Sequence, residues 1–168
     1  MKLHLTVLAL FIAGIFTACA QGKKASKTNP NSTKISGPDI SGLTMNRTGC
    51  FGKCPEYSIS IKRDGSATYV GGRNAAHQGT YTKNIGRETA ENLLNQFREH
   101  RVDTCAAIYR VRISDLPGIH FAFTINGIEK KVTNAHAGPS YFEGLALEVD
   151  RVATPDASWE KIKESPKQ

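Results

Sequence analysis

Two alternating segments around Asn126-Gly127 set the strongest limit on how this chain can fold. Alternation of apolar and polar residues indicates strands with one buried face, and Asn-Gly is a favoured two-residue hairpin turn. The sequence therefore predicts a hairpin with Ile125 opposite Ile128. Lys130 interrupts the apolar face, so we expect it near an edge of the sheet. The alternating apolar residues are Ile119, Phe121, Phe123, Ile125, Ile128 and Val132.

A second hairpin is predicted around Asp64-Gly65, because residues 57–62 alternate in the same way before that turn. A two-residue turn would place Ile59 opposite Val70. Weaker alternation predicts a first strand at 40–48, with Leu43 and Met45 on one face. Further short strands are predicted at 78–84 and around 108–112.

Two amphipathic helices complete the predicted domain, one over residues 87–101 and one after Ser140. Ser140 and Glu143 have the spacing of a capping box, and Trp159 is expected to pack at the edge of the core. The predicted fold class is α+β: an antiparallel sheet built from β-hairpins, with both helices packed on one face. The expected buried stripes are Ala90, Leu93, Leu94 and Phe97 in the first helix, then Phe142, Leu145, Val149 and Val152 in the second.

The amino terminus has the pattern of an export signal. Residues 5–16 form an uncharged apolar run that is too short to span a bilayer comfortably. The next residues, Phe16-Thr17-Ala18-Cys19, resemble the lipobox of bacterial lipoproteins. That resemblance implies a signal peptide over 1–18, a lipid thioether on Cys19, and acylation of the new amino terminus by a fatty acid such as palmitate. The alternative is a soluble secreted protein that is cleaved near Ala20.

The next segment, 19–38, is predicted to be a flexible tether, because residues 21–38 are too polar to fold. No acidic residue directly follows Cys19, which in enterobacterial-type sorting directs a lipoprotein to the outer membrane. We therefore expect an outer-membrane lipoprotein that faces the periplasm, if the cell has two membranes. A single domain over 39–160 and a polar tail over 161–168 complete the predicted organisation.

The formal net charge of +7 favours acidic partners. Export disfavours nucleic acid among them. The expected partners are the membrane, through the lipid on Cys19, and an envelope protein or a cell-wall ligand.

Cys50 and Cys54 flank a short loop that contains Gly52. In an oxidising compartment such a pair favours a structural disulfide that shapes the loop. A redox-active pair is an alternative, but it usually has two intervening residues and lies at a helix amino terminus, whereas a strand pattern follows here. A metal site would need further ligands, which Cys105 or His136 could supply. Cys105 is otherwise expected to be buried and inert.

The cysteine motif and the turns together resemble a bacterial family known only as a domain of unknown function, DUF6438. Its pattern is a Cys-Phe-Gly-x-Cys-Pro-x-Tyr motif, an Asp-Gly turn, a helix, an Asp-Leu-Pro segment, an Asn-Gly hairpin and a closing helix before a tryptophan. The similarity extends over about residues 40–159 and implies a fold and an envelope setting, but no activity. The residues that carry it are Cys50, Phe51, Gly52, Cys54, Pro55, Tyr57, Asp64, Gly65, Asp115, Leu116, Pro117, Asn126, Gly127 and Trp159.

Few residues are candidates for a functional site. Phe51, Lys53 and Tyr57 of the cysteine motif, and His136 in a Gly/Pro loop, are candidates for binding a ligand. Asp115 and His136 are the candidates for catalysis, although no metalloprotease, phosphate-loop or serine-hydrolase motif surrounds them. We expect no metal and no cofactor. The expected function is a non-enzymatic binding module of the envelope; the alternatives are a thiol-redox or other enzyme that uses the cysteine pair, and a purely structural lipoprotein.

Overall fold

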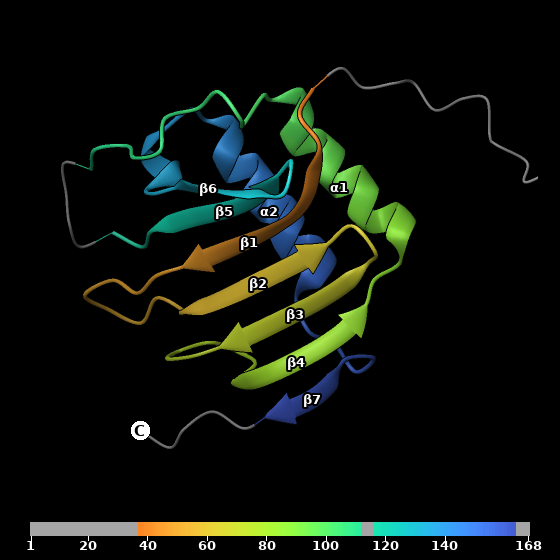
Figure 1. Ribbon diagram of the computed structural model, residues 1–168. Coiled ribbons are helices and arrows are strands. Elements are labelled where there is room, and N and C mark those ends of the chain that lie inside the picture. The colour runs from red at the N-terminus through yellow and green to blue at the C-terminus, as the bar shows by residue number, and fades with distance from the viewer. Residues whose placement is uncertain (1–36, 112–115, 164–168) are drawn as a thin grey trace, which may run out of the picture. The chain divides into compact units, whose positions relative to one another are not determined.

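The computed structural model describes residues 37–111 and 116–163 (Figure 1). The predicted signal peptide, Cys19 and the tether up to residue 36 lie outside the described residues. Asp115 and residues 164–168 also lie outside them. Among the helices in the described ranges, none is both long enough and apolar enough to cross a membrane.

The described residues form a seven-stranded antiparallel sheet with two α-helices on one of its faces (Figure 1). The strand order is β6-β5-β1-β2-β3-β4-β7. This arrangement confirms the predicted α+β class. The elements are β1 (Ile40–Arg47), β2 (Tyr57–Lys62), β3 (Ser66–Gly71), β4 (Gly79–Asn84), α1 (Arg87–Glu99), β5 (Ile119–Ile125), β6 (Ile128–Val132), η1 (Ala135–Ala137), α2 (Tyr141–Ala153) and β7 (Glu160–Lys163).

The chain builds the middle of the sheet first and then both edges. Strands β1 to β4 follow one another through consecutive antiparallel pairs. After α1 the chain returns to the side of β1, where β5 pairs with β1 and β6 forms the edge. After α2 it pairs β7 with β4 at the other edge. As a result, β1 ends where β2 and β5 begin and where β3 ends.

The register of the β2–β3 hairpin differs from the predicted one. Ile59 pairs with Tyr69 and not with Val70. The loop between the strands has three residues instead of two, and Gly65 (φ +92°) takes the positive-φ position that such a loop requires. The extra loop residue moves β3 by one position and exchanges its two faces. Tyr69 is therefore in the core, and Val70 is 43% exposed.

The β5–β6 hairpin has the predicted register, with Ile125 opposite Ile128. β6 is an edge strand, as the charge at Lys130 led us to expect. The Lys130 ammonium donates to the carbonyl oxygens of Asp103 and Cys105, each at 2.7 Å. These bonds hold the segment after α1 against the edge of the sheet.

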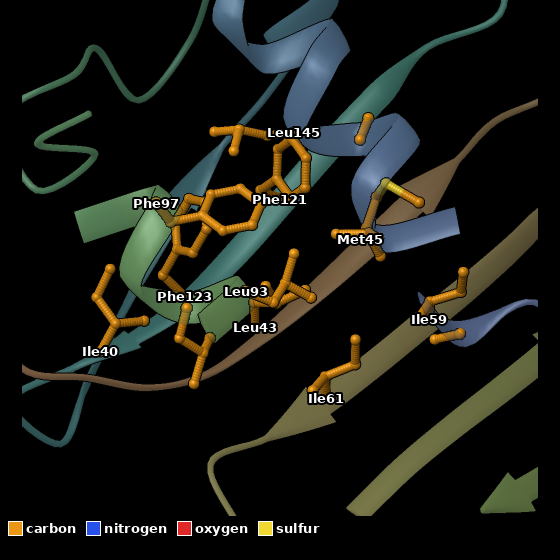
Figure 2. Close-up of a cluster of buried hydrophobic side chains, with 14 of the residues drawn as sticks. Ile40, Leu43, Met45, Ile59, Ile61, Leu93, Phe97, Phe121, Phe123 and Leu145 are labelled. Atoms are coloured by element: carbon orange, nitrogen blue, oxygen red, sulfur yellow. The ribbon is translucent and has the colours of Figure 1, made fainter. Parts of the chain in front are cut away.

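The core lies between the sheet and the two helices (Figure 2). Phe97 of α1 packs against Phe121 and Phe123 of β5, with ring centroids 5.3 Å apart in both pairs. The predicted stripe of α1 is buried. In α2 the buried stripe includes Ala146 and Ala153, whereas the predicted Val152 is only half-buried. Trp159 is buried against the same core, as predicted. Helix α2 thus packs on the core through both small and large residues, and Phe142 stacks on Phe121 of β5.

Three local predictions are wrong. Ser140 already has a right-handed helical conformation and makes no side-chain cap, because the amide of Phe142 bonds the carbonyl of Pro139 and the first turn begins there. Within residues 108–111 only an isolated bridge forms, between Ile108 and Thr133, instead of a strand. Residues 161–163, predicted as part of a polar tail, belong to β7, because they pair with the free edge of β4.

Candidate functional site

The topology gathers three loops at one end of the sheet, and the cysteine motif lies in one of them. Residues 48–56 connect β1 to β2, residues 72–78 connect β3 to β4, and residues 116–118 lead into β5. We call these three segments the disulfide end of the sheet. Residues far apart in the chain meet there, which makes it the best candidate for a functional surface.

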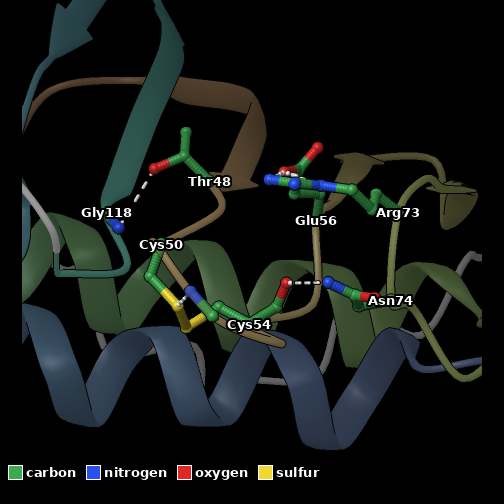
Figure 3. Close-up of a disulfide and its surroundings, with 8 residues drawn as sticks. Thr48, Cys50, Cys54, Glu56, Arg73, Asn74 and Gly118 are labelled. Atoms are coloured by element: carbon green, nitrogen blue, oxygen red, sulfur yellow. Dashed lines mark hydrogen bonds and ion pairs between the residues drawn. A yellow bond between two sulfur atoms is a disulfide. The ribbon is translucent and has the colours of Figure 1, made fainter.

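Cys50 and Cys54 are joined by the disulfide that the sequence favours, with their Cα atoms 5.5 Å apart (Figure 3). The amide of Gly52 lies inside the ring and donates to Cys50 Sγ at 3.3 Å. The covalent ring restricts the conformations of the loop. The pair contributes no free thiol in this state, so a thiol-redox function gains no support from the geometry.

Hydrogen bonds brace the disulfide loop on both sides (Figure 3). On one side, the Thr48 amide donates to the Gly118 carbonyl and the Gly118 amide donates to Thr48 Oγ1, both at 3.0 Å. On the other side, the Glu56 amide donates to the Arg73 carbonyl at 2.9 Å. The Arg73 guanidinium also bonds the Glu56 carboxylate, with Nε 2.9 Å from Oε1. The root of the loop is therefore fixed to two neighbouring segments.

The loop carries an almost completely exposed aromatic side chain. Phe51 is 96% exposed, and Lys53 beside it is also exposed. Cys54 is held from behind, because Asn74 Nδ2 donates to its carbonyl at 3.3 Å. Among the described residues, Lys53 forms no ion pair. The two binding candidates Phe51 and Lys53 thus project from the disulfide end of the sheet.

Tyr57, the third candidate of the motif, uses its hydroxyl inside the protein. The hydroxyl donates to Asp150 Oδ1 of α2 at 2.8 Å, and Arg47 bonds Asp150 Oδ2 through Nε at 3.1 Å and Nη2 at 2.6 Å. The ring stacks on Tyr69 with centroids 5.4 Å apart. Burial, and then the hydrogen bond to Asp150, raise the pKa of Tyr57 well above its ordinary value. Tyr57 is thus a neutral donor that ties the motif to α2.

An open hollow of about 450 Å³ lies beside the loop. Asn46, Ser58 and Val70 are successive cross-strand partners on the face without helices, and they line its floor. Thr48 and Glu56 line it near the loop. Its size is within the range of small-ligand sites, although its lining is more polar than is usual for them.

His136 lies in η1 and reaches the first residue of β5, where its Nδ1 accepts the Ile119 amide at 3.1 Å. It adjoins the disulfide end of the sheet through Ile119 and Gly118, and it makes no hydrogen bond to the disulfide loop. His120, which the sequence did not single out, accepts the Asn134 amide on its own Nδ1 at 3.2 Å. Within the described ranges, no group of three or more His, Cys, Asp or Glu side chains could hold a metal ion.

Cys105 is half-buried rather than fully buried. Its thiol donates to the Val102 carbonyl at 2.8 Å. Burial is the main cause that raises the pKa of the thiol above its ordinary value. A thiol with a raised pKa is a weak nucleophile near neutral pH, which agrees with an inert residue.

The sequence of the chain matches one known protein family. The model of a family described as a domain of unknown function, DUF6438, matches residues 41–153, about two thirds of the chain. The chain belongs to the DUF6438 family. No curated protein and no solved structure matches it. The DUF6438 match covers the whole disulfide end of the sheet as well as His120 and His136, but it stops before Trp159 and β7.

Proposed function

We propose that this DUF6438 protein is a non-enzymatic binding module of the cell envelope, and that the disulfide loop is its recognition element. The observation that carries the proposal is Phe51, which is 96% exposed on a covalently closed and braced loop. A phenyl ring contributes most when it enters an apolar pocket of a partner. A loop that is already ordered loses little conformational entropy on binding.

The surroundings of Phe51 indicate the chemistry of the partner. Lys53 offers an ammonium two residues away, and Leu116 of the neighbouring segment is also exposed. A matching surface would have an apolar pocket for the ring and a carboxylate near its rim for the lysine. A folded envelope protein can supply both groups. A cell-wall glycan is less suited, because it has no apolar pocket for the ring.

The proposal includes a lipid anchor on Cys19. Residues before Ile40 enter the domain at the start of β1, whereas the disulfide loop follows Arg47 at the other end of the same strand. Eight residues of strand span about 26 Å. The proposed tether would therefore be attached at the end of β1 opposite to the disulfide loop, and it would leave Phe51 free to meet a partner.

Site-specific photo-cross-linking tests the recognition element. A benzophenone amino acid replaces Phe51 in the full chain, expressed in its native host, and Leu147 is replaced in the same way as the control. Leu147 is 64% exposed and lies on α2. We expect a discrete cross-linked species from position 51 only. Identical patterns from both positions would contradict the proposal.

Affinity for the cross-linked protein then provides the quantitative test. Phe51→Ala should weaken binding by roughly 30-fold, as expected for an aromatic hot-spot residue. Leu147→Ala should leave the affinity unchanged. A Phe51→Ala variant that binds as tightly as the wild type would show that the loop is not the recognition element.

Mass spectrometry tests the anchor separately. The proposal expects the protein in the membrane fraction, with acyl chains on an amino-terminal Cys19. Cys19→Ser should prevent this modification and release the domain into the soluble fraction. A wild-type protein whose mature form lacks lipid would exclude the anchor but would leave the loop proposal standing.

A further inference from the structure

His120 and His136 each bind the main chain beside the other. His120 Nδ1 accepts the N–H of Asn134, and His136 Nδ1 accepts the N–H of Ile119. Asn134 and His136 belong to the turn after β6, whereas Ile119 and His120 are the first two residues of β5. The two reciprocal bonds therefore tie this turn to the start of β5.

Both bonds require that Nδ1 carry no proton. A ring nitrogen that accepts an N–H uses its lone pair, so a neutral imidazole in this position carries its hydrogen on Nε2. An imidazolium carries hydrogen on both nitrogens and can only donate. Protonation of either ring would place one N–H against another, and the hydrogen bond to the main chain would be lost.

Nε2, the second ring nitrogen of His136, makes histidine an unfavourable residue at this position. This nitrogen is buried and has no hydrogen-bond partner among the described residues. A buried donor without a partner destabilises the fold. An asparagine would also offer an acceptor, its Oδ1 in place of Nδ1, but that acceptor would persist at every pH. What a histidine adds at position 136 is an acceptor that disappears on protonation.

The strands around His120 supply no carboxylate to stabilise an imidazolium. β1 presents the neutral Asn46 directly opposite His120. On β6, Lys131 is paired with Glu129 at 3.1 Å. Burial first, and then the electrostatic interaction with His136, lower the pKa of His120 below its ordinary value.

The described elements around η1 likewise place no carboxylate in an ion pair with His136. The segment before the turn contributes Tyr109, whose carbonyl accepts Asn134 Nδ2 at 3.0 Å. The first turn of α2 contributes Tyr141 and the exposed Glu143. In the described part of the chain, neither imidazole forms an ion pair with a carboxylate.

We propose that His120 and His136, with the two N–H groups that they accept, form a pH-sensitive latch that is closed in neutral solution and opens in mildly acidic solution. Opening of the latch would also affect residues outside the turn after β6. Gly118 precedes Ile119 and exchanges two hydrogen bonds with Thr48 at the root of the disulfide loop. Release of the start of β5 therefore loosens one brace of the disulfide end of the sheet. The latch does not depend on the proposed binding function.

The direction of the pH effect follows from linkage. When the pKa of a histidine is lower in the folded protein than in the unfolded chain, the fold is more stable with that histidine neutral than with it protonated. Its stabilising contribution is complete above the unfolded pKa of about 6.5, and it is lost as the pH falls through the lower folded value. Acid therefore opens the latch, and alkali leaves it closed.

Amide hydrogen exchange of the full chain in mild detergent tests the latch, at about pH 7.5 and about pH 5, on either side of the ordinary histidine pKa. After correction for intrinsic exchange, protection of the Ile119 and Asn134 amides should fall about tenfold at the lower pH, as expected for the loss of one hydrogen bond. Amides in the β2–β3 pair should keep their protection. Equal protection of Ile119 and Asn134 at both values would overturn the proposal.

A double variant separates titration from hydrogen bonding. His120→Asn with His136→Asn keeps an acceptor at both positions but removes the titrating group, so protection should be the same at both pH values. The same pH-dependent loss in this variant would overturn the latch. Nitrogen-15 spectra of the wild-type imidazoles give an independent result if the variant does not fold. Nδ1 should be unprotonated at about pH 7.5, and a proton found there would equally refute the latch.

Discussion

The ion pair between Arg47 and Asp150 ties the first strand to the last helix through single side chains. Asp150→Ala would leave the Arg47 guanidinium and the Tyr57 hydroxyl without their partner in a half-buried position. We expect the free energy of unfolding to fall by about 2 kcal/mol. Urea denaturation followed by the fluorescence of Trp159, the single tryptophan, measures this loss.

Glu148→Ala is the matched control, because it removes the pair with Arg151, in which the arginine is 69% exposed. Its cost should be under about 0.5 kcal/mol. Equal losses in the two variants would show that the contacts of Asp150 are worth no more than a surface ion pair.

Single residues also show where sequence reasoning stops. Alternation places Arg47 on the same side of β1 as Leu43 and Met45, so the need for a partner could have been read from the sequence. The identity of the partner could not, because Asp150 lies 103 residues away. The same holds for His120 and His136, whose roles depend on backbone amides that the fold brings to them.

At the scale of elements, the β2–β3 turn depends on Gly65. Its φ of +92° is unfavourable for other residues, and a Cβ added there would lie 2.6 Å from the carbonyl carbon of Gly86. Gly127 in the other turn also has a positive φ (+79°), but an added Cβ would meet nothing within 4 Å. Gly65→Ala should therefore lower the free energy of unfolding by roughly 3 kcal/mol, and Gly127→Ala by about 1 kcal/mol.

Chemical denaturation of the two glycine variants gives the comparison. The difference between them measures the contact with the start of α1, because both carry the conformational cost. If Gly127→Ala costs as much as Gly65→Ala, that contact contributes nothing and the β2–β3 loop can adjust around a methyl group.

The elements with local signals could be predicted, and those defined by distant partners could not. The β5–β6 hairpin follows from its alternation and its Asn-Gly turn, and its register is correct. The Asp64-Gly65 signal located a turn but not its length, and one extra residue reversed the faces of β3. β7 carries only four residues, Glu-Lys-Ile-Lys, and it is a strand because β4 offers an open edge.

For the whole molecule, the last strand lies beyond the region that the DUF6438 family shares. Trp159 and β7 cover the core edge and β4, yet the family match ends at residue 153. A chain that ends at residue 153 should therefore expose apolar surface and an unpaired strand, and lose several kcal/mol of stability. A chain that ends at residue 163 should unfold like the full protein. Thermal unfolding compares them, and equal midpoints would show that the last strand is dispensable.

The candidate site could be predicted only in part. The spacing of Cys50 and Cys54 indicated a structural disulfide, and the loop is closed in that way. Phe51 and Lys53 are exposed as a binding loop requires, whereas Tyr57 points to α2. The braces from residues 73 and 118 come from other loops, and no pattern near the cysteines announces them.

The disulfide should matter more for the order of the loop than for the stability of the whole molecule. Its ring is short, so Cys50→Ser with Cys54→Ser should lower the free energy of unfolding by about 2 kcal/mol and leave the sheet intact. Amide exchange in residues 49–55 should nevertheless rise to that of an open chain, because only the bonds at the loop root remain. Cys105→Ser, outside the loop, is the control and should not change exchange there. If the double variant keeps an ordered loop, the hydrogen bonds at its root hold Phe51 in place by themselves, and the covalent ring is not what prepares the recognition element.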